Sequence, residues 1–338
     1  MLVEFWDQMA SPALSSSAPR TWILCPVYHD VEAFLQLRER LLEVVSKHLV
    51  LRSRHLRFYV VDDSGGLDPD VARLKQLADT TVIEPPFNLG HQRAIVYGLR
   101  RLMTSVSETD LVITMDADGE DQPEDLPRLV APLLREGARP HDITLARRTR
   151  RRESAGFKVL YVGFRLLFRL LTGLSIKTGN YAAYSGWVLR HILSHPSFDL
   201  CYSSSLVSLT LPIVYIPCER GSRYAGRSRM DLQRLFLHGL RMLMPFTDRI
   251  AIRALIGFSA IFGAGILLSI IAVTVRIFER AAIPDWAVSG LQIAVILSFI
   301  ALGNFIVLFA VFLQSRGISL ATLEDGSDER SERQTATE

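Results

Sequence analysis

Two aspartates stand two positions apart directly after an apolar run, in Val112-Ile-Thr-Met-Asp116-Ala-Asp118. In an extended segment this spacing puts both carboxylates on one side of the chain. Two like charges held together cost free energy unless a cation neutralises them. Hard oxygen ligands favour Mg²⁺ or Mn²⁺, and Mg²⁺ commonly shares its coordination shell with substrate phosphates. The pair therefore predicts a divalent-metal site that handles phosphate, although an isolated Asp-x-Asp also arises by chance or as a helix cap.

Polar residues follow two other apolar runs in the same way. Asp62 and Asp63 end the second run, where they could also form an ordinary turn. After the first run, Tyr28 could stack on a nucleobase, and Asp30 could accept hydrogen bonds from a base or a ribose. The alternative for Pro26, Tyr28 and Asp30 is a turn followed by a helix N-cap, and the residues alone leave both interpretations open.

Arginines gather at two places where a metal-bound diphosphate would need further positive charge. Five of the six residues 147–152 are Arg, directly after the apolar run Ile143–Ala146. Four more lie in Arg220–Arg229, mixed with Gly and Ser, a composition that suits a mobile loop closing over phosphates. A charge run is commonly just a solvated face, and the second cluster would also suit anionic lipid headgroups.

The elements that must position these side chains are short apolar runs alternating with helix-like segments. The expected strands are Trp22–Val27, Phe58–Val61, Leu111–Met115 and Ile143–Ala146. The expected helices are Glu32–Leu51, Asp70–Ala78, Gly90–Val106 and Glu124–Arg135. This alternation predicts an α/β domain with a mainly parallel sheet and covering helices. Ligands bind such sheets at the carboxyl ends of strands, which is where the acidic residues lie.

Two uncharged stretches, about 254–275 and 286–315, are long enough to cross a bilayer. Arg241, Arg249 and Arg253 precede the first stretch and another Arg follows the second, whereas the two Arg of the connection are offset by two acids. This bias predicts a hairpin in the cytoplasmic (inner) membrane with both termini in the cytoplasm. Buried core helices are the alternative, which the lengths disfavour. The first 20 residues show no signal-peptide pattern, so we expect a cytoplasmic first domain.

The expected layout has five parts. They are a flexible leader 1–20, a cytoplasmic domain 21–228, a juxtamembrane amphipathic helix 229–249, two transmembrane helices within 250–316, and a disordered cytoplasmic tail 317–338. An interfacial helix is also expected near 157–171, because apolar and basic residues alternate there. An ordinary helix packed on the sheet is the alternative for both amphipathic segments.

Composition narrows the function classes. The 38 Lys and Arg residues against 35 Asp and Glu give a net charge of +3, which is not the signature of a nucleic-acid-binding protein. The cysteines Cys25, Cys201 and Cys218 are too few and too scattered for a disulfide framework, and they lack a paired metal-ligand spacing. We expect three reduced thiols, and the sequence leaves the oligomeric state, including a homo-oligomer, open.

In these features the sequence resembles the family 2 glycosyltransferases, and among them the dolichol- and polyprenyl-phosphate hexose synthases. The resemblance runs in order from Trp22 to Ser228 and is followed by a membrane hairpin. Six segments carry it: Pro26-Val-Tyr28-His29-Asp30, Asp62-Asp63-Ser64, Asn88-Leu-Gly90, Asp116-Ala-Asp118-Gly-Glu120-Asp121, Arg147-x-x-Arg150, and Arg220-x-x-Arg223-x-x-Gly226-x-Ser228-Arg229. His29 and Asp30 depart from the family's Asn and Glu, and Glu120 departs from its Gln.

The resemblance implies a GT-A-like (Rossmann-like) domain followed by interfacial helices and a two-helix transmembrane hairpin. It implies that Asp116 and Asp118 are catalytic and hold Mg²⁺ or Mn²⁺, with Glu120 a further metal ligand. The residues implied to bind the nucleotide-sugar donor are Pro26, Tyr28, Asp30, Asp62, Asp63, Asn88, Gly90, Asp116, Arg147, Arg220, Arg223 and Ser228.

One departure bears on the acceptor. Gly179-Asn180-Tyr181 stands where many relatives have Gly-Asp-Phe, whose Asp is a candidate catalytic base. An amide cannot usefully accept a proton, but a phosphomonoester has its second pKa near 6 and is already largely anionic at about pH 7. Asn180, which we include among the catalytic candidates, therefore favours a phosphate nucleophile over a hydroxyl.

The function expected from this resemblance is metal-dependent, inverting transfer of a hexose from a UDP- or GDP-linked donor to a polyprenyl phosphate, for cell-envelope glycan or glycolipid assembly. One alternative is a glycosyltransferase with a hydroxyl lipid acceptor. A polymer synthase is disfavoured, because none of the four Trp residues follows an Arg as in the processive Gln-x-x-Arg-Trp motif. The other alternative is a catalytically inactive membrane scaffold of the same fold.

Overall fold

The computed structural model describes residues 19–148, 155–175, 178–193, 195–209, 211–224, 232–279 and 285–315. The expected leader up to residue 18, the expected donor ligand Ser228 and the expected tail 317–338 lie outside the described residues. The chain divides into two compact units, Met1–Thr247 and Asp248–Glu338. Each unit is described here by itself.

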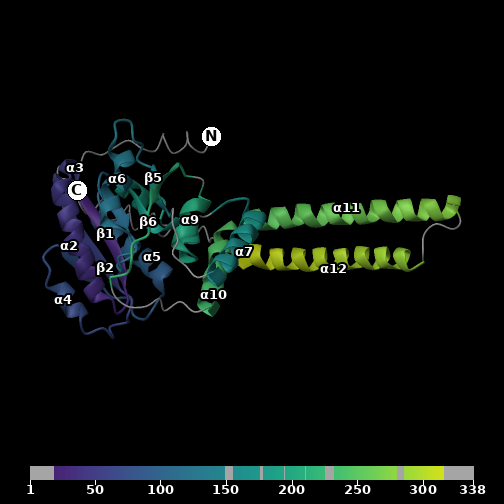
Figure 1. Cartoon of the computed structure of the whole chain (residues 1–338), viewed down its shortest axis with the longest axis horizontal. Helices are drawn as coiled ribbons and strands as arrows, with labels where there is room; N and C mark the ends of the chain where they lie inside the picture. The colour runs from purple at the N-terminus through teal and green to yellow at the C-terminus, as the bar shows by residue number, and fades with distance from the viewer. Residues whose placement is uncertain are drawn as a thin grey trace, which may run out of the picture. The chain divides into compact units, whose positions relative to one another are not determined.

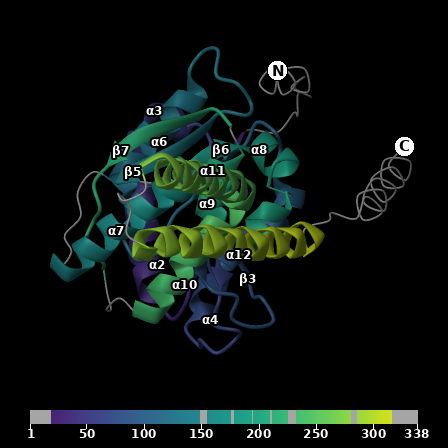
Figure 2. The ribbon, with the colours of Figure 1, turned by 90° about the vertical axis from the view of Figure 1, so that its right-hand side faces the viewer.

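The first unit is built on a seven-stranded sheet with the strand order β3-β2-β1-β4-β6-β5-β7. The strands are β1 (Arg20–Val27), β2 (His55–Asp62), β3 (Thr80–Ile83), β4 (Leu111–Thr114), β5 (Ile143–Arg148), β6 (Thr178–Ser185) and β7 (Ile213–Cys218). Among these described strands β6 is antiparallel to both of its neighbours, and every other pairing is parallel. Figure 2 shows β7, β5 and β6 side by side at one edge. The prediction of a mainly parallel α/β sheet is confirmed.

Helices cover both faces of this sheet (Figure 1). One face packs against α2 (Val31–Lys47), α4 (Val71–Lys75) and α6 (Leu126–Leu134). The other packs against α5 (His91–Leu102), α8 (Gly186–His191) and α9 (Tyr202–Ser208). β1 is buried from Thr21 to Val27 and β4 along its whole length. Because helices cover both faces of these strands, their sequences are nearly continuous apolar runs. The remaining short helices are α3 (Leu49–Arg52), η1 (Met103–Ser105), η2 (Pro123–Asp125), η3 (Pro196–Asp199) and η4 (Met244–Phe246).

Helix α5 lies unusually close to the sheet because of Gly98. A Cβ added there would stand 2.5 Å from Val61 Cγ2 and 2.9 Å from Leu24 Cδ1. Any side chain at this position would push α5 outward against a densely packed core. The first residues of α5 are thereby held near the carboxyl end of β4, at the acidic segment that follows Thr114.

Two amphipathic helices of the first unit pack on each other, α7 (Ala155–Thr172) and α10 (Leu232–Leu243). The rings of Phe168 on α7 and Phe246 in η4 lie 5.4 Å apart, edge to face. Both helices leave large apolar side chains exposed, including Leu166 at 70% and Phe236 at 67%. The helices expected near 157–171 and 229–249 therefore have an apolar surface that the sheet does not cover.

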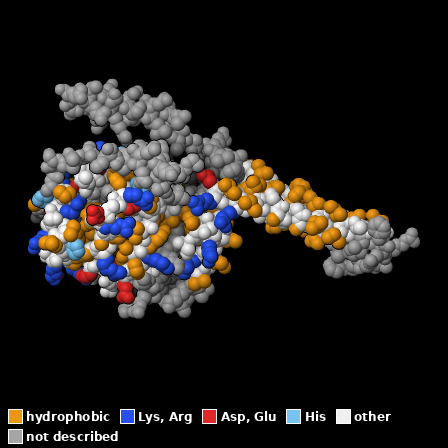
Figure 3. Space-filling model, turned by 90° about the horizontal axis from the view of Figure 1, so that it is seen from above, with side chains coloured by type: hydrophobic (Ala, Val, Ile, Leu, Met, Phe, Trp, Pro, Cys, Tyr) orange, Lys and Arg blue, Asp and Glu red, His pale blue; other side chains and the backbone are white. Residues whose placement is uncertain are grey.

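The second unit contains two long helices, α11 (Thr247–Glu279) and α12 (Asp285–Ser315). Segments Phe236–Ile271 and Val288–Val307 are long and apolar enough to cross a membrane. Figure 3 shows hydrophobic side chains along the surface of these helices. Leu267 is 58% exposed and Ile300 is 55% exposed, so these are not the buried core helices of a water-soluble domain. The expected spans 254–275 and 286–315 fall within α11 and α12.

Candidate active site

The acidic segment directly follows β4, at the carboxyl end of the central strands. It folds back on itself: the backbone N–H of Asp116 donates to Asp121 Oδ2 at 3.0 Å, and the N–H of Glu120 donates to Asp118 Oδ1 at 3.0 Å. Gly119 between them has a φ of +87°, a conformation in which glycine carries little strain. The turn gathers four carboxylates, those of Asp116, Asp118, Glu120 and Asp121.

Asp116 lies at the centre of a ring of donors. Its Oδ1 is 3.0 Å from His91 Nε2 and accepts a hydrogen bond from Asn180 Nδ2 at 3.1 Å. Its Oδ2 is 3.8 Å from the Arg148 guanidinium. Burial alone would raise the pKa of Asp116, but the His91 and Arg148 charges, together with the Asn180 hydrogen bond, hold it well below its usual range. Asp116 is thus an anion throughout the physiological range.

The pKa values of Asp118 and Asp121 are raised, in contrast to that of Asp116. Burial raises the pKa of Asp118 to about 6, and the adjacent Asp116 charge adds to the effect. Burial and Asp116 also raise the pKa of Asp121, although Arg148 lies 3.5 Å from its Oδ1. The cations among the described residues therefore do not fully compensate these carboxylates, and a further cation would be stabilised here.

Asn180, on β6, is fixed in one orientation by the start of α5. Its Oδ1 accepts a hydrogen bond from Gln92 Nε2 at 2.6 Å, and its Nδ2 faces Asp116 and lies 2.6 Å from His91 Nε2. Gln92 in turn accepts bonds at its Oε1 from Ser203 N and Cys201 Sγ, at 3.1 and 3.3 Å. With 8% of its surface exposed, Asn180 presents N–H groups, not an acceptor, to the acidic centre.

The segment after β7 brings arginines over the acidic turn. Arg223 Nη2 lies 3.0 Å from Asp118 Oδ2, and its Nε donates to Glu120 Oε1 at 3.1 Å. Arg220 pairs with the other carboxylate oxygen of Glu120. The two backbones are also joined, because the N–H groups of Gly221 and Tyr224 donate to the carbonyls of Glu120 and Asp118, both at 2.9 Å. We call residues 219–224 the arginine loop.

Tyr224 anchors the arginine loop from the side. Its ring lies over Gly119 so closely that a Cβ on Gly119 would stand 2.6 Å from Tyr224 Cε2. Arg40 of α2 donates to the Tyr224 hydroxyl at 2.8 Å, and its guanidinium lies 5.5 Å from the ring centroid. A second guanidinium nitrogen of Arg40 donates to Glu124 at 2.5 Å. The absence of a side chain at residue 119 is therefore what allows the loop and the acidic turn to meet.

The residues expected to bind the nucleotide lie at the ends of β1 and β2. Tyr28 is 41% exposed and its ring stands edge-on to His29, with centroids 4.7 Å apart. Asp30 is half-buried at the start of α2, close enough to Arg223 to stabilise its charge. Pro26 is buried. Contact of these residues with a donor stays a prediction.

Asp62 and Asp63 hold loops in place. The Asp62 carboxylate accepts from the N–H and the hydroxyl of Ser64, at 3.0 and 2.9 Å. Both Asp63 oxygens accept backbone N–H groups, from Leu89 at 2.7 Å and from Gly90 at 2.9 Å, and Asn88 Nδ2 donates to the Asp63 carbonyl at 2.8 Å. These bonds set the loop that leads into His91, so Asp63, Asn88 and Gly90 act together in building the site.

Of the two arginines at the end of β5, the structure brings Arg148 and not Arg147 to the acidic turn. Successive strand residues point to opposite faces. Arg148 lies by Asp116 and Asp121, whereas the exposed Arg147 lies near enough to Tyr215 for its charge to oppose the raised pKa of that phenol. Gly179 makes room for Arg148, since a Cβ there would stand 2.8 Å from the Arg148 Nη2.

His91 and Gln92 had no role among the residues predicted from the sequence. Asp121 was part of the predicted acidic segment and Arg148 part of the arginine cluster 147–152, but neither was given a contact of its own. His91 and Gln92 directly follow Gly90 at the expected helix start, and that position was the available signal. For Arg148, the signal was alternation along the strand, because Ala146 and Arg148 share a face that Arg147 does not. No sequence feature paired Gln92 with Asn180, 88 positions away.

The donor set suits a hard divalent cation that shares its ligands with a phosphate. Among the described residues, no three His, Cys, Asp or Glu side chains are arranged to hold a metal by themselves. Asp116 offers a fixed negative charge and Asp118 a carboxylate whose charge is not fully compensated, so an ion there would need oxygens from a substrate to complete its shell. Glu120, expected as a third ligand, is instead directed to Arg220 and Arg223.

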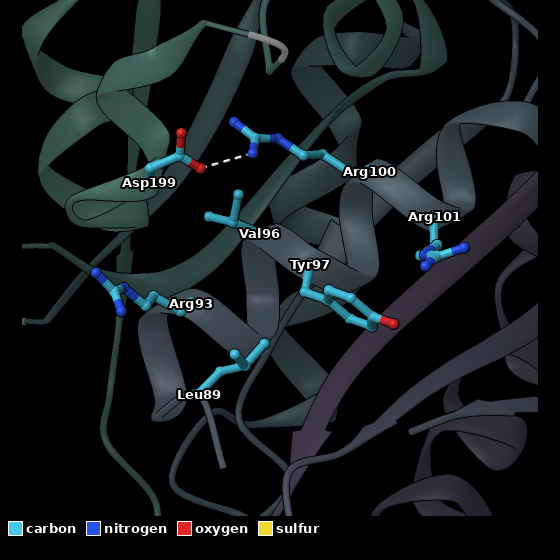
Figure 4. A pocket seen from close by; sticks show the side chains of 7 residues that line it. All are labelled: Leu89, Arg93, Val96, Tyr97, Arg100, Arg101 and Asp199. Atoms are coloured by element: carbon cyan, nitrogen blue, oxygen red, sulfur yellow. Dashed lines mark hydrogen bonds and ion pairs between the residues drawn. The ribbon is translucent and has the colours of Figure 1, made fainter. Parts of the chain in front are cut away.

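A cavity that could hold a ligand lies elsewhere. It has a volume of about 560 Å³ and is shallow. Figure 4 shows its lining along the outer side of α5, where Arg100 pairs with Asp199 at 2.6 Å. None of the carboxylates of the acidic turn lines it. The site is therefore defined by its charged residues and not by this cavity.

The sequence is similar to one known protein family and to several named enzymes. The model of the family described as glycosyl transferase family 2 matches residues 23–193. The undecaprenyl-phosphate 4-deoxy-4-formamido-L-arabinose transferase of Proteus mirabilis is 27% identical over 293 residues, covering 83% of each chain. The enzyme of the same name from Pectobacterium atrosepticum is 26% identical over 280 residues, covering 79% of each.

Among solved structures, a mannosyltransferase from Pyrobaculum calidifontis in complex with GDP-Man and Mn²⁺ is 14% identical, with a TM-score of 0.40 over 89% of this chain and 94% of that one. The mannosyl-3-phosphoglycerate synthase of Rubrobacter xylanophilus is 12% identical, with a TM-score of 0.43 over 69% and 74%.

Proposed function

Because the chain belongs to glycosyl transferase family 2 and is a glycosyltransferase, we propose that it transfers a sugar from a UDP- or GDP-linked donor to a polyprenyl phosphate. The reaction takes place at the cytoplasmic face of the inner membrane and supplies cell-envelope glycan or glycolipid assembly. The single observation that carries the donor half of this proposal is the meeting of the Asp116–Asp118 turn with the guanidinium groups of Arg220 and Arg223.

That arrangement matches the charges of a metal-bound diphosphate. Asp116 and Asp118 would hold Mg²⁺ or Mn²⁺, which when bound neutralises charge on a leaving diphosphate. Arg220 and Arg223 supply planar guanidinium groups that can each donate two hydrogen bonds to phosphate oxygens. Tyr28 and Asp30, at the end of β1, are the proposed contacts for base and ribose.

The acceptor half rests on Asn180 and on the relatives. Asn180 directs its N–H groups toward the acidic centre and offers no general base. A phosphate oxygen, already anionic at about pH 7, can attack without one. The relatives described above are named as undecaprenyl-phosphate sugar transferases. The apolar surfaces of α7 and α10, and the two long helices of the second unit, are suited to a lipid substrate.

The proposed reaction is an in-line displacement with inversion at the anomeric carbon. The bond between that carbon and the acceptor phosphate oxygen forms as the bond to the nucleoside diphosphate oxygen breaks. The leaving group departs as the diphosphate anion, and Arg220 and Arg223 stabilise its growing charge. Arg148, paired with Asp116 and Asp121, holds the acidic turn in shape while this occurs.

The test is sugar transfer to polyprenyl phosphate by the Asp118→Ala variant. We expect the rate to fall by about 10²-fold or more, because the variant loses one of two proposed metal ligands and the partner of Arg223. Circular dichroism of the variant checks that it is folded. Undiminished activity in a folded Asp118→Ala protein would rule out the metal-site assignment.

A further inference from the structure

Glu120 is the most heavily engaged carboxylate of the acidic turn. Its two oxygens pair separately with Arg220 and with Arg223 Nε, the latter at 3.1 Å. Its carbonyl accepts the Gly221 N–H at 2.9 Å, so backbone and side chain both contact the arginine loop. Only 13% of the Glu120 side chain is exposed. Four residues of the turn are acidic, but Glu120 alone among them bridges both arginines of the loop.

The pairing divides the charges of the site into two groups. Asp116 and Asp121 share Arg148. Arg220 pairs with Glu120, and Arg223 pairs with both Glu120 and Asp118. The arginines proposed to bind the donor diphosphate are therefore already neutralised by carboxylates of the chain.

We propose that Glu120 is not a metal ligand but a stand-in for the donor diphosphate, which occupies Arg220 and Arg223 until the donor arrives. The inference rests on the proposed function, because it requires a diphosphate at this site. A carboxylate and a phosphate present the same pair of anionic oxygens to a guanidinium, so they compete for its N–H groups. Glu120 positions the arginine loop over the turn and sets the affinity for the donor by this competition.

This role and that of a metal ligand predict opposite outcomes for Glu120→Ala, and Glu120→Gln isolates the effect of the charge. The Gln side chain has nearly the same shape but carries no charge. If Glu120 competes with the diphosphate, the variant releases both arginines and removes a repulsive charge, and nucleoside diphosphates bind more tightly. If Glu120 were a metal ligand, Glu120→Ala, which leaves no oxygen in its place, would bind both Mn²⁺ and nucleotide more weakly. If Glu120 competes with the diphosphate, both Glu120→Gln and Glu120→Ala bind nucleotide more tightly. A folding defect could only weaken binding, so a gain of affinity in both variants is diagnostic.

The experiment is a calorimetric titration of UDP and of GDP, with Mn²⁺ present, into the full-length protein in detergent. We expect Glu120→Gln to bind whichever nucleotide the wild type binds roughly tenfold more tightly, since hydrogen bonds to charged groups are involved. Glu108→Gln is the control, because it removes one negative charge from a carboxylate that pairs with His191 and lies before β4, at the other end of that strand from the acidic turn. Its affinity should stay within about twofold of wild type.

A second measurement needs no nucleotide. Limited trypsin digestion, followed by intact-mass analysis, reports how firmly residues Arg220 and Arg223 are held. Glu120→Gln should be cut after these arginines several times faster than the wild type and Glu108→Gln. Equal or weaker nucleotide binding by Glu120→Gln, or unchanged cleavage, overturns the inference alone. Failure of the wild type to bind either nucleotide counts first against the proposed function, and the inference falls with it.

Discussion

At the scale of single residues, the site is an excess of negative charge held in a small volume. Asp116 keeps its charge because His91, Arg148 and Asn180 all contact it. The charge of Asp116 disfavours ionisation of the neighbouring carboxylates. Burial and the Asp116 charge together raise the pKa of Asp118 to about 6. A residue in this state is suited to binding a cation but destabilises the protein when no cation is present.

We therefore expect Asp118→Asn to stabilise the metal-free protein at pH 7.5. The folded pKa of Asp118 lies above its ordinary value of 3.8, so the folded state binds more protons between about pH 4 and 6, and the stability contributed by this group is lost as pH rises through that window. The shift, which already includes the attraction of Arg223, bounds the gain at about 3 kcal/mol. Thermal unfolding followed by tryptophan fluorescence measures it. At pH 4 the difference should nearly vanish; a destabilised variant at pH 7.5 would contradict the account.

The two adjacent arginines of β5 provide a matched pair. Arg148→Lys replaces a guanidinium that reaches both Asp116 and Asp121 by a single point charge, and we expect kcat/KM for sugar transfer to fall by about 10²-fold. Arg147→Lys should leave kcat/KM within about threefold, because Arg147 is exposed and faces away from the turn. Initial rates with saturating acceptor measure both. Equal losses in the two variants would show that the side chains were assigned to the wrong faces.

The sequence could identify residues whose spacing alone carries information. Asp116 and Asp118 were predicted from their position after a strand. The structure pairs Asp118 with Arg223, and Glu120 of the same turn with Arg220; the loop composition had singled out both arginines. The contacts of His91 and Gln92 with residue 180 could not be predicted, because they depend on how α5 and β6 meet in space. A local sequence pattern does not reveal contacts between residues that are so far apart in the chain.

At the scale of elements, the site depends on two loops that are joined before any substrate arrives. The acidic turn and the arginine loop share two backbone hydrogen bonds, and Tyr224 lies over Gly119. Arg40 on α2 donates a hydrogen bond to the Tyr224 hydroxyl, so a helix near the start of the chain holds the arginine loop in place. Ordering these groups in advance reduces the entropy that donor binding must overcome.

Gly119→Ala tests this junction, with Gly137→Ala as the control. Both glycines have positive φ, +87° and +77°, so alanine strains both by about 1–2 kcal/mol. A Cβ at residue 119 also meets the Tyr224 ring, whereas one at residue 137 has nothing within 4 Å. We expect only Gly119→Ala to weaken Mn²⁺-dependent nucleotide binding, by about tenfold or more. Equal affinities in the two variants, measured by calorimetry, would exclude the Tyr224 contact as a determinant.

The strands of the sheet were predicted unevenly. β1, β2, β4 and β5 are continuous apolar runs, and each was expected within a few residues of its bounds. β6 was missed because its sequence, Thr-Gly-Asn-Tyr-Ala-Ala-Tyr-Ser, is small and polar, which a strand between two neighbours tolerates when its tyrosines are buried. β3 and β7 lie at the edges of the sheet and have no continuous buried face to mark them.

At the scale of the whole molecule, apolar surface is exposed where a water-soluble protein would bury it. α7 and α10 leave Leu166, Leu170 and Phe236 exposed in the first unit. The helices of the second unit expose apolar side chains along most of their described length. Length and hydropathy could predict the long helices from sequence, because crossing a bilayer requires about 20 apolar residues in one run.

The proposed orientation places the connection between α11 and α12 outside the cytoplasm. We expect a cysteine introduced at residue 282 (Ala282→Cys) to react in intact cells with a membrane-impermeant maleimide. One introduced at residue 336 (Ala336→Cys) should react only after the membrane is permeabilised, because the arginines that flank the spans favour the inside. The native Cys25, Cys201 and Cys218 are buried, so background labelling should be low. The reverse labelling pattern would refute the orientation.

The most direct test of the account compares two acceptors that differ only in one phosphate. The purified full-length enzyme is incubated with Mn²⁺ and a panel of UDP- and GDP-sugars, together with either undecaprenyl phosphate or undecaprenol. The mass of the lipid product is then measured by mass spectrometry. We predict a product one sugar residue heavier with undecaprenyl phosphate and none with undecaprenol, because Asn180 cannot activate a hydroxyl at the position where many relatives carry an Asp. Transfer to undecaprenol at a comparable rate would contradict the account.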